Sequence, residues 1–274
     1  MHVLLSGGTG FIGQALAPAL AARGHAVTVL TRRARTADAA RGVRCIDALD
    51  RLDEPLDAVI NLAGASLAGR RWSAAYKREI VASRVAFTRH LGQDLAALGQ
   101  APRHWLNASA IGFYGPRAAD VDLAEDAAQG EGFAARLCAD WEDAARAAAP
   151  AGARVVLLRL GVVLHRSGGA FQQMAAPFRL GVAHWMGSGR QVLSWIHRDD
   201  AVAAIGFLLD DAAPAGAYNL TAPQPVSSRE FCRAMRRVYT TLPAAPLPAA
   251  LLRVLVGEMA DELLLSGQDR KSVV

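Results

Sequence analysis

The sequence predicts an α/β fold, in which a doubly wound parallel sheet is followed by a smaller C-terminal α/β lobe. Apolar runs of strand length alternate with helical stretches through residues 1–165, and strands separated in this way form parallel sheets with right-handed crossovers. Gly, Pro and Trp then become frequent and the alternation stops. We therefore expect residues 166–274 to form the smaller lobe, interwoven with the first part and covering its ligand-binding side.

The expected strands are short apolar runs, each followed by a helical stretch or a glycine-containing loop. They are predicted at residues 1–6, 26–30, 56–62, 105–109 and 154–160. Helices are predicted from the first glycine loop to about residue 23, over residues 74–98 and over residues 133–148. In an open sheet of this kind, ligands bind outside the carboxyl ends of the strands.

A glycine-rich loop follows the first strand directly. It consists of Gly7, Gly8, Thr9, Gly10, Phe11, Ile12 and Gly13, and an Ala/Leu-rich helix comes next. In this frame Gly7 permits a tight turn, Gly10 lets the backbone approach a pyrophosphate, and Gly13 lets the helix pack onto the sheet. The N–H groups at the helix start, at its positive dipole end, then face the phosphates. The loop predicts a Rossmann dinucleotide site, and a glycine turn without a ligand is the alternative.

The end of the second strand indicates which dinucleotide the site would take. A site for NAD carries an acidic residue roughly 20 positions after the glycines, which binds the ribose 2′-hydroxyl. This sequence has Thr31, Arg32 and Arg33 in that region. Because an arginine suits a 2′-phosphate through charge-assisted bidentate hydrogen bonds, we expect NADP, with Arg32 ahead of Arg33. Two solvated arginines without a ligand are the alternative.

Composition and patterning exclude several classes of protein. The chain has 274 residues, of which 52% are hydrophobic, and a net charge of +5. Its arginines are scattered and no basic tail is present, so we expect no nucleic-acid partner. The sequence has no membrane-spanning run and no signal peptide, which predicts a cytoplasmic protein. Cys45, Cys138 and Cys232 have no ligand spacing, so we expect no metal site.

Several further segments resemble those of one family. They are Asn61–Ala65, Gly69–Trp72, Ser83–Arg84, Ser109–Gly115, Leu158–Leu164, Pro177–Gly181, Trp195–Asp200 and Leu263–Gln268. Together with the glycine loop they resemble the extended short-chain dehydrogenase/reductase superfamily, and more specifically its atypical epimerase-like branch within the NAD-dependent epimerase/dehydratase superfamily. The resemblance covers nearly the whole chain. It implies an NADP-dependent oxidoreductase.

The resemblance also implies cofactor contacts beyond the glycine loop. Leu62 and Ala63 would touch the adenosine side through backbone groups, and Val163 would line the nicotinamide end. Glu79 and Arg84 lie on the helix after the third predicted strand, with Arg84 placed to reach phosphate or ribose. An ordinary exposed helix pair is the alternative for these two residues.

The proton-transfer pair of the superfamily is missing. Typical members use Tyr-x-x-x-Lys, in which the lysine lowers the tyrosine pKa so that tyrosine acts as acid or base. The residues four positions after the tyrosines are Ile80, Ala118, Ala222 and Pro243. The stretch where the pair is expected offers Phe133 and Leu137, neither of which transfers a proton.

Two hydroxyl side chains remain as catalytic candidates. Ser109 ends a predicted strand and could bond a substrate carbonyl or hydroxyl, while Tyr114 in the following loop could exchange a proton. The alternatives are a strand-end cap for Ser109 and loop packing for Tyr114. His197 is expected to order the loop into the next helix, with Asp199 capping that helix.

Three functions are compatible with this pattern. The leading hypothesis is an NADP(H)-dependent oxidoreductase acting on a small carbonyl or alcohol whose identity is unknown, through Ser109, Tyr114 or bound water. The second is a non-catalytic NADP(H)-responsive regulatory protein, and the third is a sugar-nucleotide epimerase or dehydratase. We expect a monomer or a homodimer. Residues 269–274 resemble no part of the family, so we expect the smaller lobe to be truncated at its C-terminus.

Overall fold

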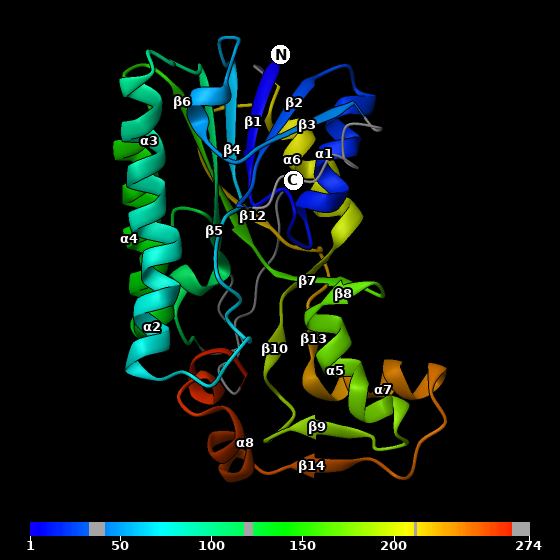
Figure 1. Cartoon of the computed structure of the whole chain (residues 1–274). Helices are drawn as coiled ribbons and strands as arrows, with labels where there is room; N and C mark the ends of the chain where they lie inside the picture. The colour runs from blue at the N-terminus through cyan, green and yellow to red at the C-terminus, as the bar shows by residue number, and fades with distance from the viewer. Residues whose placement is uncertain (33–41, 118–122, 211–212, 265–274) are drawn as a thin grey trace.

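A seven-stranded parallel sheet forms the centre of the molecule in the computed structural model, which describes residues 1–32, 42–117, 123–210 and 213–264 (Figure 1). The strand order is β12-β6-β5-β4-β1-β2-β3, and every adjacent pair is parallel. This confirms the predicted Rossmann-like α/β fold. The strands are β1 (His2–Ser6), β2 (Ala26–Leu30), β3 (Val43–Ile46), β4 (Ala58–Asn61), β5 (His104–Ala110), β6 (Arg154–Leu160) and β12 (Gly216–Leu220).

Helices cover both faces of this sheet. On one face lie α1 (Gly13–Ala22) and α6 (Arg198–Leu208), and on the other α3 (Phe87–Ala97) and α4 (Phe133–Ala148), as Figure 1 shows. The alternation of β1 explains both layers, because Val3 and Leu5 join the core under α1 and α6 while Leu4 joins the core under α3 and α4. The predicted helix over residues 74–98 is present as α2 (Ala74–Val81), a π-helical turn (Ala82–Ala86) and α3.

The smaller lobe lies below the carboxyl ends of the strands in Figure 1 and has a core of its own. Buried Phe178 and Ala175 pack against Cys232 and Met235. Elements after residue 160 that are not in the central sheet or its flanking helices are β7 (Val162–His165), β8 (Gly168–Gly169), α5 (Ala170–Arg179), β9 (His184–Met186), β10 (Val192–Leu193), β11 (Trp195–His197), β13 (Val226–Ser227), α7 (Ser228–Val238), β14 (Ala245–Leu247), α8 (Ala249–Val256) and a π-helical turn (Ala260–Leu264).

The chain crosses between the two parts more than once. It leaves the sheet after β6, returns for α6 and β12, and then enters the lobe again at β13. Near the end of the described chain, Glu262 accepts hydrogen bonds from the N–H groups of Phe133 (2.8 Å) and Ala134 (3.0 Å). A carboxylate thus caps the positive end of α4, which Gly132 leaves without a side-chain cap. No helix in the described ranges has the length and apolarity that spanning a membrane requires.

Candidate functional site

The glycine loop joins the carboxyl end of β1 to α1 and has little room for side chains. Gly7 has a φ of +73°, and a Cβ on it would lie 2.6 Å from the backbone carbon of Leu62. A Cβ on Gly13 would lie 2.4 Å from the carbonyl oxygen of Gly7. A Cβ on Gly10 would meet only that same oxygen, at 3.1 Å. Backbone packing therefore requires glycine at positions 7 and 13, whereas Gly10 faces open space beside the loop.

The start of α1 faces the same space. Its N-cap residue is Ile12, no side chain caps the helix, and its first turn carries no acidic residue. The positive end of the helix dipole is therefore not neutralised by the first turn of the helix. Gln14 holds the loop by donating to the carbonyl of Thr9 at 2.8 Å, and Phe11 packs where a Cβ on Gly169 would lie, 2.6 Å from its Cε1. Such a helix start binds anions.

A buried amide joins the ends of three neighbouring strands at this edge. Asn61 accepts a hydrogen bond from the Ser6 hydroxyl (2.6 Å) and from the N–H of Ala63 (3.2 Å). Its amide nitrogen donates to Thr88 (2.8 Å) and to Asn107 (2.7 Å). These bonds hold β1, β4 and β5 in register and fix the turn that carries Leu62 and Ala63. The sequence analysis did not identify this network.

The residues expected to select the cofactor lie at the end of β2. Arg32 is exposed and follows Thr31, whose N–H donates to the carbonyl of Ile46 on β3 at 2.9 Å. That bond continues the sheet to the point where Arg32 leaves it. Arg33 lies outside the described residues.

Glu79 and Arg84 lie in different surroundings. Glu79 is on the exposed side of α2, 3.5 Å from the guanidinium of Arg70. Arg84 is in the π-helical turn, with its guanidinium carbon 5.1 Å from the centre of the Trp141 ring and 2.9 Å from where a Cβ on Gly64 would be. Burial lowers the pKa of this guanidinium. Within the described chain, Arg84 forms no ion pair, so a half-buried cation lies beside the turn after β4.

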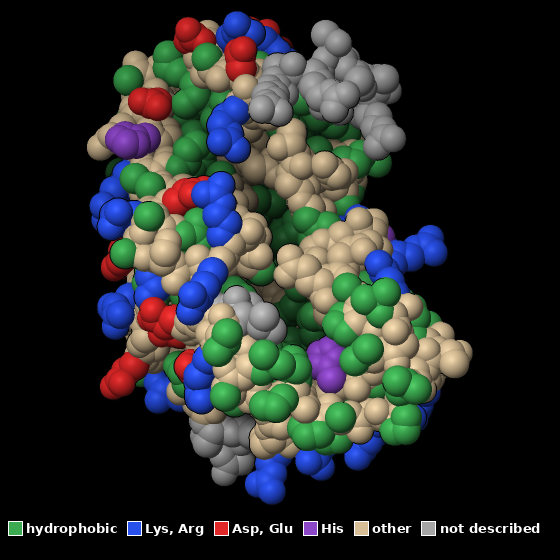
Figure 2. All heavy atoms as spheres, turned by 60° about the horizontal axis from the view of Figure 1, so that its bottom comes forward, with side chains coloured by type: hydrophobic (Ala, Val, Ile, Leu, Met, Phe, Trp, Pro, Cys, Tyr) green, Lys and Arg blue, Asp and Glu red, His purple; other side chains and the backbone are tan. Residues whose placement is uncertain are grey.

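Val163 lies in the strand that begins the smaller lobe. It is half-buried, pairs with Ile196 of β11 and packs against the core under α1 and α6. Between the two parts of the molecule the surface is hollowed, with hydrophobic side chains on its floor (Figure 2). The predicted nicotinamide contact is therefore at the junction of the sheet and the lobe.

Ser109 and Tyr114 share one buried polar network. Ser109 is 2% exposed and donates to Glu142 at 2.7 Å, and Arg159 donates to the two oxygens of Glu142 at 2.8 and 3.0 Å. Tyr114 is fully buried; its hydroxyl accepts from Arg159 at 2.7 Å and donates to Asn219 at 2.9 Å. Burial opposes the charge of Arg159, but Glu142 outweighs it and raises the pKa of the guanidinium.

The geometry of this network gives both hydroxyls partners inside the protein. Tyr114 lies in a short 3-10 helix (Ile111–Tyr114) and not in an open loop. Neither hydroxyl reaches the surface, which favours the alternatives of a strand-end bond for Ser109 and packing for Tyr114. Their catalytic roles remain predictions.

The place of the missing Tyr-x-x-x-Lys pair is apolar. Phe133 contacts Trp72 edge to face, with ring centres 5.1 Å apart, and the ammonium of Lys77 lies 4.9 Å from the Phe133 ring centre. Leu137 is buried in the same cluster. This part of α4 therefore contributes packing where typical members of the superfamily place an acid.

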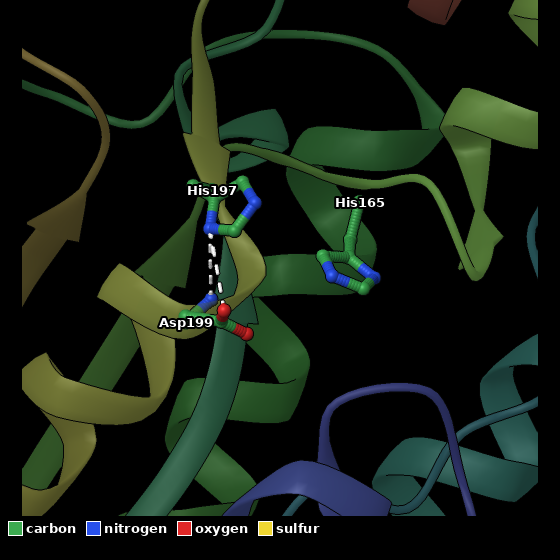
Figure 3. Close-up of side chains that lie close together, drawn as sticks. All are labelled: His165, His197 and Asp199. Carbon is green, nitrogen blue, oxygen red and sulfur yellow. Dashed lines mark hydrogen bonds and ion pairs between the residues drawn. The ribbon is translucent and has the colours of Figure 1, made fainter.

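A cluster of two histidines and one aspartate lies near the glycine loop (Figure 3). Ligand atoms of His165, His197 and Asp199 lie within 4.8 Å of one another. However, the guanidinium of Arg198 donates to Asp199 at 3.0 Å and lies 3.4 Å from His165 Nε2. Burial and then the charge of Arg198 lower the pKa of His165. A metal ion would have to displace this guanidinium, which also lies 5.8 Å from the ring centre of Phe11.

The same cluster corrects the predicted cap of α6. The N-cap residue is His197, whose Nδ1 accepts a hydrogen bond from the N–H of Asp199 at 3.3 Å. Asp199 is the second residue of α6 and so lies inside the helix, after the N-cap position. Its carboxylate accepts hydrogen bonds from Arg198 instead. A histidine ring nitrogen two residues before a helical N–H takes the place that an aspartate oxygen was expected to fill.

Known proteins match the chain over most of its length. The model of the NAD dependent epimerase/dehydratase family matches residues 3–221. An epimerase family protein of Mycobacterium bovis is 40% identical over 268 residues, which are 97% of this chain and 88% of that protein. The epimerase family protein YfhF of Bacillus subtilis is 33% identical over 274 residues, covering 98% of this chain and 89% of the relative.

A solved structure agrees with the fold. The human epimerase family protein SDR39U1, whose crystal structure contains NADPH, superposes with a TM-score of 0.85 at 34% identity, covering 99% of this chain and 91% of that one. The similarity thus extends over the sheet and the smaller lobe.

Proposed function

This chain belongs to the NAD-dependent epimerase/dehydratase family, and we propose that it binds NADP(H) and transfers hydride between that cofactor and a small carbonyl or alcohol. The observation that carries the proposal is the glycine loop, in which Gly10 faces open space in front of an uncapped helix start. Similarity to SDR39U1, which was crystallised with NADPH, supports the choice of cofactor.

The residues around the loop fit a phosphorylated dinucleotide. The N-terminus of α1 would hold the pyrophosphate, and Arg32 at the end of β2 would pair with the ribose 2′-phosphate. Arg84, half-buried and without an ion pair among the described residues, would hydrogen-bond a ribose or phosphate oxygen near the turn after β4. Ala63 and Val163 would contact the adenosine and nicotinamide ends. The bound cofactor would supply or accept the hydride.

The proton of the reaction needs a source other than a tyrosine–lysine pair. Phe133 and Leu137 are apolar, and the hydroxyls of Ser109 and Tyr114 are bonded within the buried network. Of the three sources we predicted, bound water in the hollow between the sheet and the lobe agrees best with this burial. The network around Glu142 then acts as support for the carboxyl ends of β5 and β6.

A second candidate function is supported by the same burial. A protein that binds NADP(H) and presents its occupancy to a partner needs the cofactor loop but no proton-transfer group. The apolar surroundings of Phe133 are compatible with that role. A sugar-nucleotide epimerase or dehydratase fits less well, because those reactions depend on the tyrosine that is missing.

Thermal unfolding with NADPH, NADP, NADH and NAD at matched concentrations tests the cofactor. We expect a raised midpoint with the two phosphorylated forms, and Arg32→Ala should remove most of that preference. Exposed Arg51, which pairs with Asp47 at 2.9 Å away from the loop, supplies a matched arginine-to-alanine control. Equal shifts with NADPH and NADH would contradict the assignment of Arg32.

Turnover separates the two candidate functions. NADPH consumption is followed with a panel of small aldehydes and ketones, using the Gly10→Ala variant as the control that lacks the cofactor space. Consumption that depends on one carbonyl compound and is lost in the variant supports the oxidoreductase. Cofactor binding without turnover on any member supports the regulatory protein.

A further inference from the structure

The smaller lobe contains a basic pocket formed by one face of α7. Arg229, Arg233 and Arg236 are spaced by four and three positions, so their side chains lie on the same side of the helix. They line a pocket of about 360 Å³ together with Trp185, Cys232, Pro243 and Ala244. The pocket belongs entirely to the lobe, whereas the glycine loop lies at the edge of the central sheet (Figure 1).

The positive charges of this pocket are not neutralised within the described chain. Arg229, Arg233 and Arg236 form no ion pair with a described carboxylate; the nearest polar partner is Thr241, whose hydroxyl lies 3.4 Å from Arg236 Nε. The single acid of α7, Glu230, is used by its capping box. The capping hydrogen bonds, first the one from the backbone of Ser227, lower the pKa of Glu230, and the charge of Arg233 lowers it further, so Glu230 offsets part of the charge of that one arginine.

Trp185 gives the pocket a fixed wall. The guanidinium carbon of Arg229 lies 5.0 Å from the centre of the indole, a cation–π contact that orients the guanidinium. The indole Nε1 is buried and has no hydrogen-bond partner among the described residues. A Cβ on Gly189 would lie 2.4 Å from Arg229 Cγ and 2.6 Å from Trp185 Cδ1, so this glycine leaves room for the stacked pair.

We infer that this pocket binds the phosphate group of a small molecule. Three arginines that line one pocket without an ion-paired carboxylate favour a multiply charged oxyanion, and their planar guanidinium groups match phosphate oxygens.

Calorimetric titration of the full chain with inorganic pyrophosphate tests the inference, in the Gly10→Ala background so that the glycine loop does not take up the ligand. Arg233→Ala and Arg236→Ala should each weaken binding about tenfold or more, as expected for loss of a charge-assisted hydrogen bond. Trp185→Ala removes the indole that orients the Arg229 guanidinium, and it should weaken binding a few-fold. The matched control is Arg237→Ala, which changes the same charge on the same helix outside the pocket.

The outcomes decide the inference. A loss confined to the pocket variants, with Arg237→Ala within about twofold of the wild type, supports a built site. Equal weakening by Arg237→Ala would mean diffuse attraction and would overturn it, as would the absence of pyrophosphate binding. Sedimentation with phosphatidylglycerol vesicles identifies the source of the phosphate: vesicle binding that is lost in Arg233→Ala would assign the pocket to a lipid headgroup and overturn the small-molecule ligand. Because the readouts are variants of α7, the result is independent of whether NADPH binds.

Discussion

Substituting Gly10 by alanine should separate folding from cofactor binding. The added Cβ would have one contact, with the carbonyl oxygen of Gly7 at 3.1 Å, which a shift of a few tenths of an ångström relieves. We therefore expect the unfolding midpoint of the free protein to fall by less than about 2 °C. The methyl group would, however, occupy the space through which a pyrophosphate approaches the loop.

The size of the effect follows from mass action. A ligand at roughly 100 times its dissociation constant stabilises the folded state by about 2.7 kcal/mol, which is roughly 5–10 °C for a chain of this size. Wild-type protein should show this shift with NADPH, and Gly10→Ala should lose most of it. A full shift in the variant would refute the placement of the phosphates over Gly10.

Two controls complete the experiment. In Gly13→Ala the new Cβ would lie 2.4 Å from the Gly7 oxygen and 2.5 Å from Gly8 Cα, so this variant should be destabilised even without ligand. In Gly112→Ala the Cβ would have only ordinary contacts, the nearest at 3.5 Å from Ala134 Cβ, and the NADPH shift should persist. Differential scanning fluorimetry measures all three variants.

Three further predictions concern the buried groups. Glu142→Gln should destabilise the protein by about 3–5 kcal/mol in urea unfolding, because it leaves Arg159 buried without its counter-charge. The control Asp143→Asn, on the exposed side of α4, should cost under about 1 kcal/mol. Similar costs for both variants would contradict the network. Tyr114→Phe should cost about 1–3 kcal/mol by removing the bond to Asn219, whereas lost turnover at unchanged stability would indicate a catalytic hydroxyl. Burial raises the pKa of the Cys138 thiol to about 11, so at neutral pH iodoacetamide should modify it only through unfolding. The free energy of unfolding should fall as pH rises from 9.0 toward 11, because the unfolded thiol ionises in this range and the folded one does not. Rapid labelling of the native protein, read by mass spectrometry, would be inconsistent with this burial.

The parts of the fold that the sequence analysis predicted are those with a continuous apolar signal. The central strands are buried on both faces and appear as unbroken apolar runs, of which Arg154–Leu160 was predicted to the residue. The two strands that were missed, β3 and β12, are the edges of the sheet. Edge strands are partly exposed, so Val43–Ile46 and Gly216–Leu220 lack such a run.

The polar networks could not be predicted in the same way, because their partners are distant in sequence. Ser109 and Glu142 are 33 positions apart, and Glu142 and Arg159 are 17 apart. One local signal was present: Arg159 interrupts an apolar strand, and Glu142 lies beside Trp141 on the buried side of α4. Charges at such positions are buried only when paired, which is a reason to search for a partner.

The two candidate functions share cofactor binding and differ only in turnover. Around the proposed cofactor site, the helix start of α1, Arg32 and Arg84 are all positive and have no carboxylate partner in the described chain, which favours binding of a polyphosphate. At the carboxyl ends of β5 and β6, Glu142 and Arg159 neutralise each other and hold the nearby hydroxyls. Hydride transfer needs the positively charged region that would hold the cofactor, and a proton from an accessible donor. Turnover would therefore require a proton donor such as bound water beside the substrate, while the binding step is common to both functions.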